Sequence, residues 1–359
     1  TTKSENTPWY TGVPLLEYLE NVDIEEKTTE KGFYMPVQRV SRPNHTFRGF
    51  QGQVEAGTIS VGDEITTLPS NEKAHVKSLL VGDKKAETIE KGQPVTIQLD
   101  REVDVSRGCV LEKDTDIKVS SSITATLLWM DDDILENGKN YFVKLGTKMI
   151  PGIVTEIVHT VDVNTGEEKK ADKLSKNEIA LCTISLADKI VVDEFKNHKT
   201  LGELILIDRV TNMTSACGVV EKVNEGGEGL FAGRVDRNVR AALNGQKAVA
   251  IAFPVERQGV SRSLLEKVEK ELSIQGKHTY LYAPGSEENI SDVIKHLHHA
   301  GVITLLLVEE KYASTVRIAS EEYYHVLPED IKVETDEIVK YIDELSAYDV
   351  RVAGNGEFI

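Results

Sequence analysis

The sequence predicts a multidomain protein in which two antiparallel β-barrels are followed by an α/β domain. The chain has 359 residues, more than one hydrophobic core usually supports. Short β-type runs punctuated by glycine fill residues 33–223, and beyond residue 230 the apolar residues recur with the spacing of alternating strands and helices. With 40% apolar and 28% charged residues, the composition is that of a folded globular protein.

The first barrel is expected over residues 31–118, because closely spaced β-type runs separated by turn signals are typical of small barrels. The runs are FYMPVQRV, GFQGQVEAGTI, GDEITTL, AHVKSLLV, QPVTIQLD and SRGCVLE. Glycines 49, 52, 57 and 62 are expected to supply positive φ angles at turns and bulges.

The second barrel is expected over residues 119–223, from a further series of β-type runs. These are SSITATLLWM, NYFVKLG, MIPGIVTEIVHTVDV, EIALCTISL, KIVVDEF, LGELILIDRV and ACGVVEKV. Turns at 164–166 and at Gly202 fit antiparallel connections. The glycine-rich stretch 225–229 is expected to join this barrel to the next domain.

The α/β domain is expected over residues 230–359. Its predicted strands are 247–253, 278–282 and 302–308. One helix between them has Leu264, Leu265, Val268 and Leu272 inward, a second has Ile290, Val293, Ile294 and Leu297 inward, and a last helix covers 336–346. Ser263 with Glu266 forms a possible capping box, and Gly276 and Gly301 are expected to end the first two helices. Helices that alternate with strands predict a parallel sheet.

Charge and composition exclude several classes of function. With 42 basic and 59 acidic residues the net charge is −17, which disfavours extended nucleic-acid contact. The apolar run 302–308 is too short to cross a bilayer, so a cytoplasmic protein is expected. No metal site is expected: Cys109, Cys182 and Cys217 lie far apart, and the acidic run 131–133 indicates an exposed turn. His296, His298 and His299 lack the i, i+4 spacing of a helical metal site, which favours a solvated face.

Four motifs carry a resemblance to a known family. The opening SENTPWYTG at 4–12, followed by LLEYLE at 15–20, resembles the segment that joins the GTPase domain to the first barrel in the large subunit of heterodimeric bacterial sulfate adenylyltransferase. MPVQRV at 35–40 and FRGF at 47–50 resemble the same family's second domain, a relative of elongation factor Tu. The resemblance covers roughly residues 1–220. It implies barrels like domains II and III of that factor, and a linker at 1–30.

The family's GTPase motifs are absent from the sequence, which contains no G-x-x-x-x-G-K-[ST] phosphate loop. The resemblance therefore implies a fragment that lacks the GTPase domain. No cofactor is expected in this chain, because GTP and Mg²⁺ would bind the missing domain. The family's chemistry, which makes adenylylsulfate and diphosphate from ATP and sulfate, would lie on a separate small catalytic subunit. This chain alone is expected to be inactive.

A docking surface is one interpretation of five residues in the first barrel, Arg39, Arg42, Phe47, Arg48 and Phe50. Three guanidiniums beside two aromatic rings are typical of an interface, here with the missing GTPase domain or the small catalytic subunit. The alternative is a merely solvated face.

The C-terminal domain resembles adenylylsulfate kinase, which follows the second barrel in bifunctional relatives. Such a kinase has a glycine-rich phosphate loop ending in Gly-Lys-Ser-Thr. Aligned with that loop, Ser261 stands at the lysine, Arg262 at the serine and Ser263 at the threonine, and Gly259 is the remaining glycine. We therefore expect a degenerate nucleotide site without kinase activity. Arg257 or Arg262 could bind an anion at the helix N-terminus, but a salt-bridged surface arginine is the favoured alternative.

Three functions from different classes remain open. The first is a structural and assembly part of the regulatory subunit of sulfate adenylyltransferase. The second is a translation-factor-like protein that binds or delivers RNA, which the acidic charge and the motif at 4–12 disfavour. The third is an active adenylylsulfate kinase, which requires phosphate-loop residues that the sequence lacks.

Overall fold

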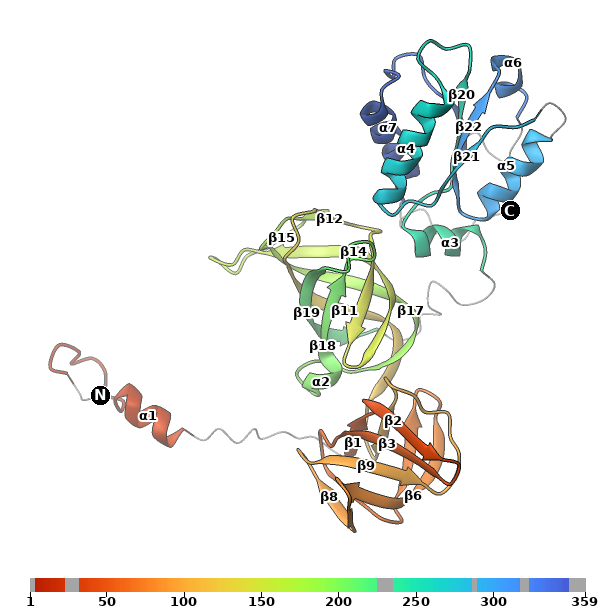
Figure 1. Ribbon diagram of the computed structural model, residues 1–359. Coiled ribbons are helices and arrows are strands. Elements are labelled where there is room, and N and C mark those ends of the chain that lie inside the picture. Colours follow the sequence, from red (N-terminus) through yellow and green to blue (C-terminus); the bar gives the residue numbers. More distant parts are fainter. Residues whose placement is uncertain (1–3, 23–31, 225–234, 286–288, 317–322, 349–359) are drawn as a thin grey trace. The chain divides into compact units, whose positions relative to one another are not determined.

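The computed structural model describes residues 4–22, 32–224, 235–285, 289–316 and 323–348 (Figure 1). Its contacts divide the chain into two units, Thr1–Glu30 and Lys31–Ile359. The described residues of the first unit, 4–22, contain one short helix, α1 (Leu15–Asn21), in which no residue is buried. Every contact described below lies within the second unit, and the glycine-rich stretch 225–229 falls outside the described residues.

The first barrel contains an eight-stranded antiparallel sheet with the order β1-β10-β5-β6-β9-β3-β2, in which β7 pairs with β6, and a small β4–β8 ribbon. Its strands are β1 (Phe33–Pro36), β2 (Arg39–Asn44), β3 (Phe47–Gln53), β4 (Thr58–Ser60), β5 (Glu64–Leu68), β6 (Glu72–Val81), β7 (Lys84–Ala86), β8 (Thr88–Glu90), β9 (Pro94–Leu99) and β10 (Val110–Lys113). Alternate residues face the core, as Val95, Ile97 and Leu99 do in β9.

The second barrel closes on itself, because β13 pairs with both β18 and β14 in the order β13-β18-β19-β11-β17-β14-β15. Its elements are β11 (Lys118–Trp129), β12 (Leu135–Glu136), β13 (Asn140–Leu145), β14 (Lys148–Val161), β15 (Glu168–Lys169), β16 (Lys173–Leu174), β17 (Ile179–Val192), α2 (Lys199–Gly202), β18 (Glu203–Ile207) and β19 (Thr214–Val223). Closure leaves the ring strands without a free edge.

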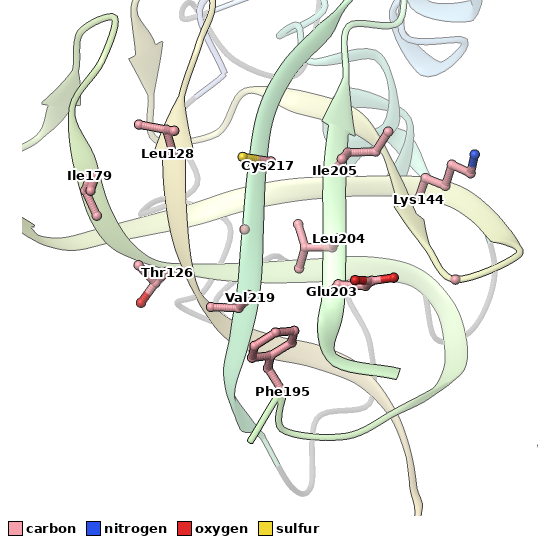
Figure 2. Close-up of a pocket in the computed structure, with 12 residues that line it drawn as sticks. Thr126, Leu128, Lys144, Ile179, Phe195, Glu203, Leu204, Ile205, Cys217 and Val219 are labelled. Atoms are coloured by element: carbon pink, nitrogen blue, oxygen red, sulfur yellow. The ribbon is translucent and has the colours of Figure 1, made fainter. Parts of the chain in front are cut away.

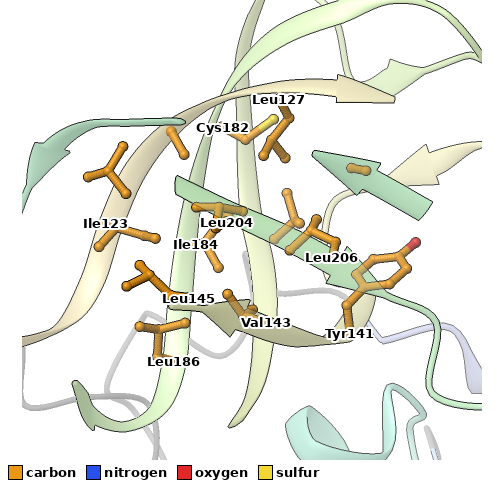
Figure 3. Close-up of a cluster of buried hydrophobic side chains, with 14 of the residues drawn as sticks. Ile123, Leu127, Tyr141, Val143, Leu145, Cys182, Ile184, Leu186, Leu204 and Leu206 are labelled. Atoms are coloured by element: carbon orange, nitrogen blue, oxygen red, sulfur yellow. The ribbon is translucent and has the colours of Figure 1, made fainter. Parts of the chain in front are cut away.

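The core of the second barrel is filled by alternate residues of its long strands (Figure 3). In β11 these are Ile123, Ala125, Leu127 and Trp129, all fully buried. Trp129 packs edge-on against Tyr141, with ring centroids 5.7 Å apart, and its Nε1 donates to the Asp133 carbonyl at 2.7 Å. A buried indole N–H needs such a partner, so this bond lets the largest core side chain be buried.

The two barrels contact each other through a small buried cluster that includes Tyr34 and Leu201. The Tyr34 hydroxyl lies 3.1 Å from Thr200 Oγ1, and its ring packs edge-on against His198 at 4.8 Å. His198 is buried, and its Nδ1 lies 2.5 Å from Asp193 Oδ2. Apolar and hydrogen-bonded contacts therefore join the barrels.

The α/β domain contains a four-stranded parallel sheet with the order β21-β22-β20-β23. Its elements are α3 (Arg237–Asn244), β20 (Ala250–Pro254), α4 (Arg262–Ile274), β21 (Thr279–Tyr282), α5 (Ile290–His299), β22 (Ile303–Val308), α6 (Glu310–Ala313), β23 (Tyr324–Val326) and α7 (Thr335–Ser346). The fold class predicted from the sequence is confirmed: two antiparallel barrels precede a parallel α/β domain.

Helices cover both faces of this sheet (Figure 1). Ile251 and Phe253 of β20 pack with residues of α4 and α7, whereas Ala250 and Ala252 of the same strand pack with residues of α5 and α6. Because successive side chains of a strand point to opposite faces, a central strand covered on both sides is apolar throughout. This explains why all five residues of β20 are buried.

Some local predictions are wrong. Ser261, not Ser263, caps α4, because its side chain accepts from the Leu264 amide. Gly202 ends helix α2 instead of forming a hairpin turn, and a Cβ there would lie 2.3 Å from Phe195 Cα. Of the four glycines expected to have positive φ in the first barrel, residues 57 and 62 do have it, whereas residues 49 and 52 are needed for close packing.

Candidate functional site

The five predicted docking residues lie on or beside the β2–β3 hairpin, but they do not form one exposed surface. Arg48 donates from Nη1 to Glu102 Oε2 at 2.7 Å and to the Val103 carbonyl at 2.9 Å. Its Nη2 donates to the Val105 carbonyl at 2.9 Å, and its guanidinium lies over the Phe50 ring. Phe50 itself is 1% exposed. Arg48 and Phe50 therefore hold the barrel together and are not available to a partner.

Three of the five residues remain accessible: Arg39 and Arg42 are exposed on β2, and Phe47 is half-buried. Arg42 forms an exposed ion pair with Glu102, the residue that also binds Arg48. The hydrogen bond from Arg48 lowers the pKa of the Glu102 carboxyl, and Arg42 adds to the effect. An exposed pair such as Arg42–Glu102 adds little stability, so its guanidinium can exchange partners.

The predicted nucleotide loop lies between β20 and α4, at the carboxyl edge of the sheet, where open α/β sheets bind ligands. Gly259 has a φ of +90°, and the Ser261 side chain caps the N-terminus of α4. Arg262 is exposed and pairs with Glu266 one turn further along the helix, at 3.1 Å. Ser263 is exposed on the first turn of α4. The four predicted residues are thus adjacent, but the Ser261 and Arg262 side chains are bonded to other groups of the protein.

Two residues of the same loop, Glu256 and Arg257, close it against the rest of the domain. Arg257 Nη1 donates to the carbonyls of Leu327 and Pro328 at 2.8 and 2.7 Å. Its Nη2 donates to the carbonyl of Ile331 at 2.5 Å, and the longer bond to Glu329 measures 3.3 Å. Arg257 therefore ties the loop after β20 to the segment that links β23 to α7, and it is not free to bind an anion.

Glu256 reaches the other side of the loop. Its Oε2 accepts from the backbone amide of Glu310, the first residue of α6, at 2.9 Å. A phosphate group bound near this edge would meet a carboxylate, with repulsion between like charges. The sequence signal for this repulsion is the acidic Glu256 in the stretch that aligns with the phosphate loop of the kinase.

The histidines of α5 do not share one environment. His296 and His299 are exposed, as predicted, but His298 is only 6% exposed, so the prediction of a solvated face is wrong for this residue. Its Nε2 lies 2.8 Å from Arg237 Nη1, which donates the hydrogen bond, and its ring lies 4.6 Å from the Tyr323 ring. His298 follows the buried Ile294 by four residues, and this spacing is the signal that sequence reasoning missed.

His298 makes the protein sensitive to acid. Burial lowers its pKa from the ordinary 6.5 to about 4, and the neighbouring positive charge of Arg237 adds to the effect. The unfolded chain takes up this proton near pH 6.5 and the folded chain only near pH 4, so stability should fall as the pH is lowered between these values. We expect a loss of about 2 to 3 kcal/mol across this window. Urea unfolding between pH 7 and pH 4 measures it.

The His298→Gln variant should lose this part of the pH dependence, because its side chain does not titrate. His296→Gln is the matched control, since His296 is exposed on the same helix. Equal slopes for the wild type and His298→Gln would contradict the prediction.

A separate apolar groove of about 600 Å³ crosses the outer face of the second barrel (Figure 2). Leu128, Ile205, Cys217 and Val219 project into it from neighbouring strands, and Phe195 closes one end. Within the described part of the chain, no group of three or more His, Cys, Asp or Glu residues is placed to hold a metal ion. Among the described helices, none has the length and apolar character needed to span a bilayer.

Known proteins resemble this chain over part of its length. Residues 122–221 match the family model described as GTP-eEF1A C-terminal domain-like. The solved structure of Sup35 complexed with GDP superimposes with a TM-score of 0.52 at 21% identity, covering 61% of this chain and 54% of that one. This likeness supports the fold alone.

Curated relatives have higher sequence identity. Sulfate adenylyltransferase subunit 1 of Saccharophagus degradans is 42% identical over 224 residues, which cover 62% of this chain and 48% of the relative. The bifunctional enzyme NodQ of Rhizobium meliloti is 33% identical over 281 residues, 77% of this chain and 44% of the relative. The chain thus spans about half the length of the curated relatives it matches. Over these stretches it is a homologue of sulfate adenylyltransferase subunit 1 and of NodQ.

Proposed function

We propose that this chain is the barrel-bearing part of a regulatory sulfate adenylyltransferase subunit, which acts in the cytoplasm in sulfate activation. The observation that carries the proposal is the 42% identity to a subunit 1 protein over 224 residues. Two contacting barrels with an elongation-factor-like second domain fit the same assignment. Its role is structural: it holds partners together, and the formation of adenylylsulfate and diphosphate from ATP and sulfate takes place on another subunit.

The partner in this proposal is a small catalytic subunit, since the relatives are named as subunit 1 of the enzyme. GTP and Mg²⁺ would bind the part of the relatives that this chain does not match. The accessible docking residues reduce to Arg39, Arg42 and Phe47, because Arg48 and Phe50 are used within the barrel.

The α/β domain, in the same proposal, is a scaffold without kinase activity. Three features support this. Glu256 accepts a hydrogen bond from the Glu310 amide, and Arg257 donates to four backbone carbonyls. Ser261 is at the position where a phosphate-binding lysine is expected. A loop without that lysine loses a cation and the close backbone approach that neutralise nucleotide phosphates. An active adenylylsulfate kinase is therefore disfavoured.

Charge reversal tests the docking surface and the assembly role together. The Arg39→Glu/Arg42→Glu variant, mixed with the small catalytic subunit and followed by calorimetry, is expected to bind at least ~10-fold more weakly than the unmodified chain. Arg48 is left intact because its substitution would damage the barrel. Lys84→Glu/Lys85→Glu on β7 makes the same change in charge elsewhere on the barrel and should leave binding within about twofold.

The outcomes separate the two claims. If the unmodified chain does not bind the small subunit at all, the assembly role fails. If it binds and the Arg39→Glu/Arg42→Glu variant binds equally well, the role stands and the docking surface lies elsewhere.

A further inference from the structure

Helix α3, which sequence analysis did not predict, lies at the start of the α/β domain. It has only eight residues, is capped by the Asp236 side chain at the Val239 amide, and ends at Gly245 with a φ of +62°. Isolated helices shorter than about 12 residues are marginal in water, so α3 depends on the groups that pack against it.

One set of contacts binds α3 to the α/β domain. Arg237 donates to the buried His298 of α5 at 2.8 Å, and Arg240 donates to the His299 carbonyl at 3.3 Å. Two residues after the helix, Gln246 is fully buried. Its Nε2 donates to the carbonyls of His278 and Gly301, at 3.0 and 2.8 Å, and its Oε1 accepts from the His278 amide at 2.8 Å.

Gln246 thereby joins the exit of α3 to the residues that precede β21 and β22. A buried amide with both ends bonded fixes the local geometry, because any displacement leaves polar atoms unsatisfied. The α3 segment is therefore attached to the amino edge of the sheet, opposite the loop closed by Arg257.

A second set of contacts binds the carbonyls at the C-terminal end of α3 to the second barrel. Asn140, the first residue of β13, donates from Nδ2 to the carbonyls of Ala242 and Leu243, at 3.2 and 2.5 Å. Arg209, after β18, also donates to the Leu243 carbonyl, and its guanidinium lies over the Phe142 ring. Burial lowers the pKa of this guanidinium.

The carbonyls at the end of a helix lack partners within the helix and form the negative end of its dipole. A cation and an amide donor from the barrel satisfy them, which makes this helix end complementary to the barrel surface in charge and in hydrogen bonding.

A further contact lies beside this junction. Gly276, which ends α4, has a φ of +83°, and a Cβ there would lie 2.3 Å from Cγ2 of Val210, the residue after Arg209. Backbone of the α/β domain thus approaches the barrel closely at a second point.

We infer that α3 is a coupling helix: its carbonyl end is docked on Asn140 and Arg209 of the second barrel, and its Arg237 and Arg240 side chains with Gln246 are bound to the α/β domain. The barrel and the α/β domain then move as one body, although a glycine-rich stretch precedes the helix in the sequence. The inference does not depend on the proposed function.

Hydrogen exchange by mass spectrometry on the full chain tests the coupling, because a helix this short exchanges quickly once undocked. In Asn140→Ala/Arg209→Ala, amides of residues 237–244 are expected to exchange at least ~10-fold faster than in the unmodified chain. Asn164→Ala/Lys144→Ala removes an amide and a cation of the same barrel that are not bonded to α3, and should leave these rates unchanged.

Amides of β11 are followed in the same experiment to confirm that the barrel stays folded. Arg209→Lys keeps the charge but loses the planar donor group, so an intermediate rise in the exchange rates of α3 is expected. If β11 loses protection in the double variant, the result for Arg209→Lys decides the question. Unchanged exchange in α3 with β11 protected would overturn the inference.

Discussion

Trp129→Ala is expected to destabilise the second barrel by about 3 to 5 kcal/mol, the range for removing a large aromatic side chain from a packed core. Trp129 is fully buried, packs edge-on against Tyr141 and donates its indole N–H to the Asp133 carbonyl. The alanine variant leaves a cavity in the closed ring and removes this bond. Urea unfolding followed by far-UV circular dichroism measures the loss.

Trp129→Phe separates the two contributions, since it keeps an aromatic ring but has no N–H. We expect this variant to lose about 1 to 3 kcal/mol, less than the alanine variant. A loss below about 1 kcal/mol for Trp129→Ala would mean that the barrel core does not depend on this side chain.

Arg257→Ala should destabilise the α/β domain by about 2 to 4 kcal/mol, because four backbone carbonyls lose their donor at once. Arg262→Ala is the matched control. The Arg262 side chain is 70% exposed and has a single helical ion pair, so its removal should cost no more than about 0.5 kcal/mol. Thermal unfolding of the full chain compares the two variants, and equal losses would contradict the structural role of Arg257.

The same samples are tested for nucleotide chemistry. Titration of the unmodified chain with ATP and with adenylylsulfate, in the presence of magnesium, is expected to give neither tight binding nor phosphoryl transfer. Each missing transition-state donor costs roughly 10²- to 10³-fold in rate, by analogy with oxyanion-hole deletions. Submicromolar ATP binding together with turnover would refute the proposal that this domain has lost its kinase activity.

The candidate sites could be predicted only in part from the sequence. Arg39, Arg42 and Arg48 have the same side chain within ten residues, yet Arg48 supports the barrel through two carbonyls and Glu102, whereas Arg39 and Arg42 are exposed. The difference depends on where Glu102, Val103 and Val105 lie, more than fifty residues along the chain. No local pattern contains that information.

Sequence by itself determined the fold class: period-two alternation produced the strands of both barrels, and the change of period beyond residue 230 produced the α/β domain, because these periods follow from backbone geometry alone. Only the tertiary structure decided which polar side chains are bonded within the protein and which remain exposed. The packing of distant segments gave Arg257 its carbonyls, buried His298 beside Arg237, and brought Asn140 and Arg209 to the end of α3. Long-range contacts of this kind are set by the folded chain as a whole, since each partner is specified by its place in space and not by its neighbours in the sequence.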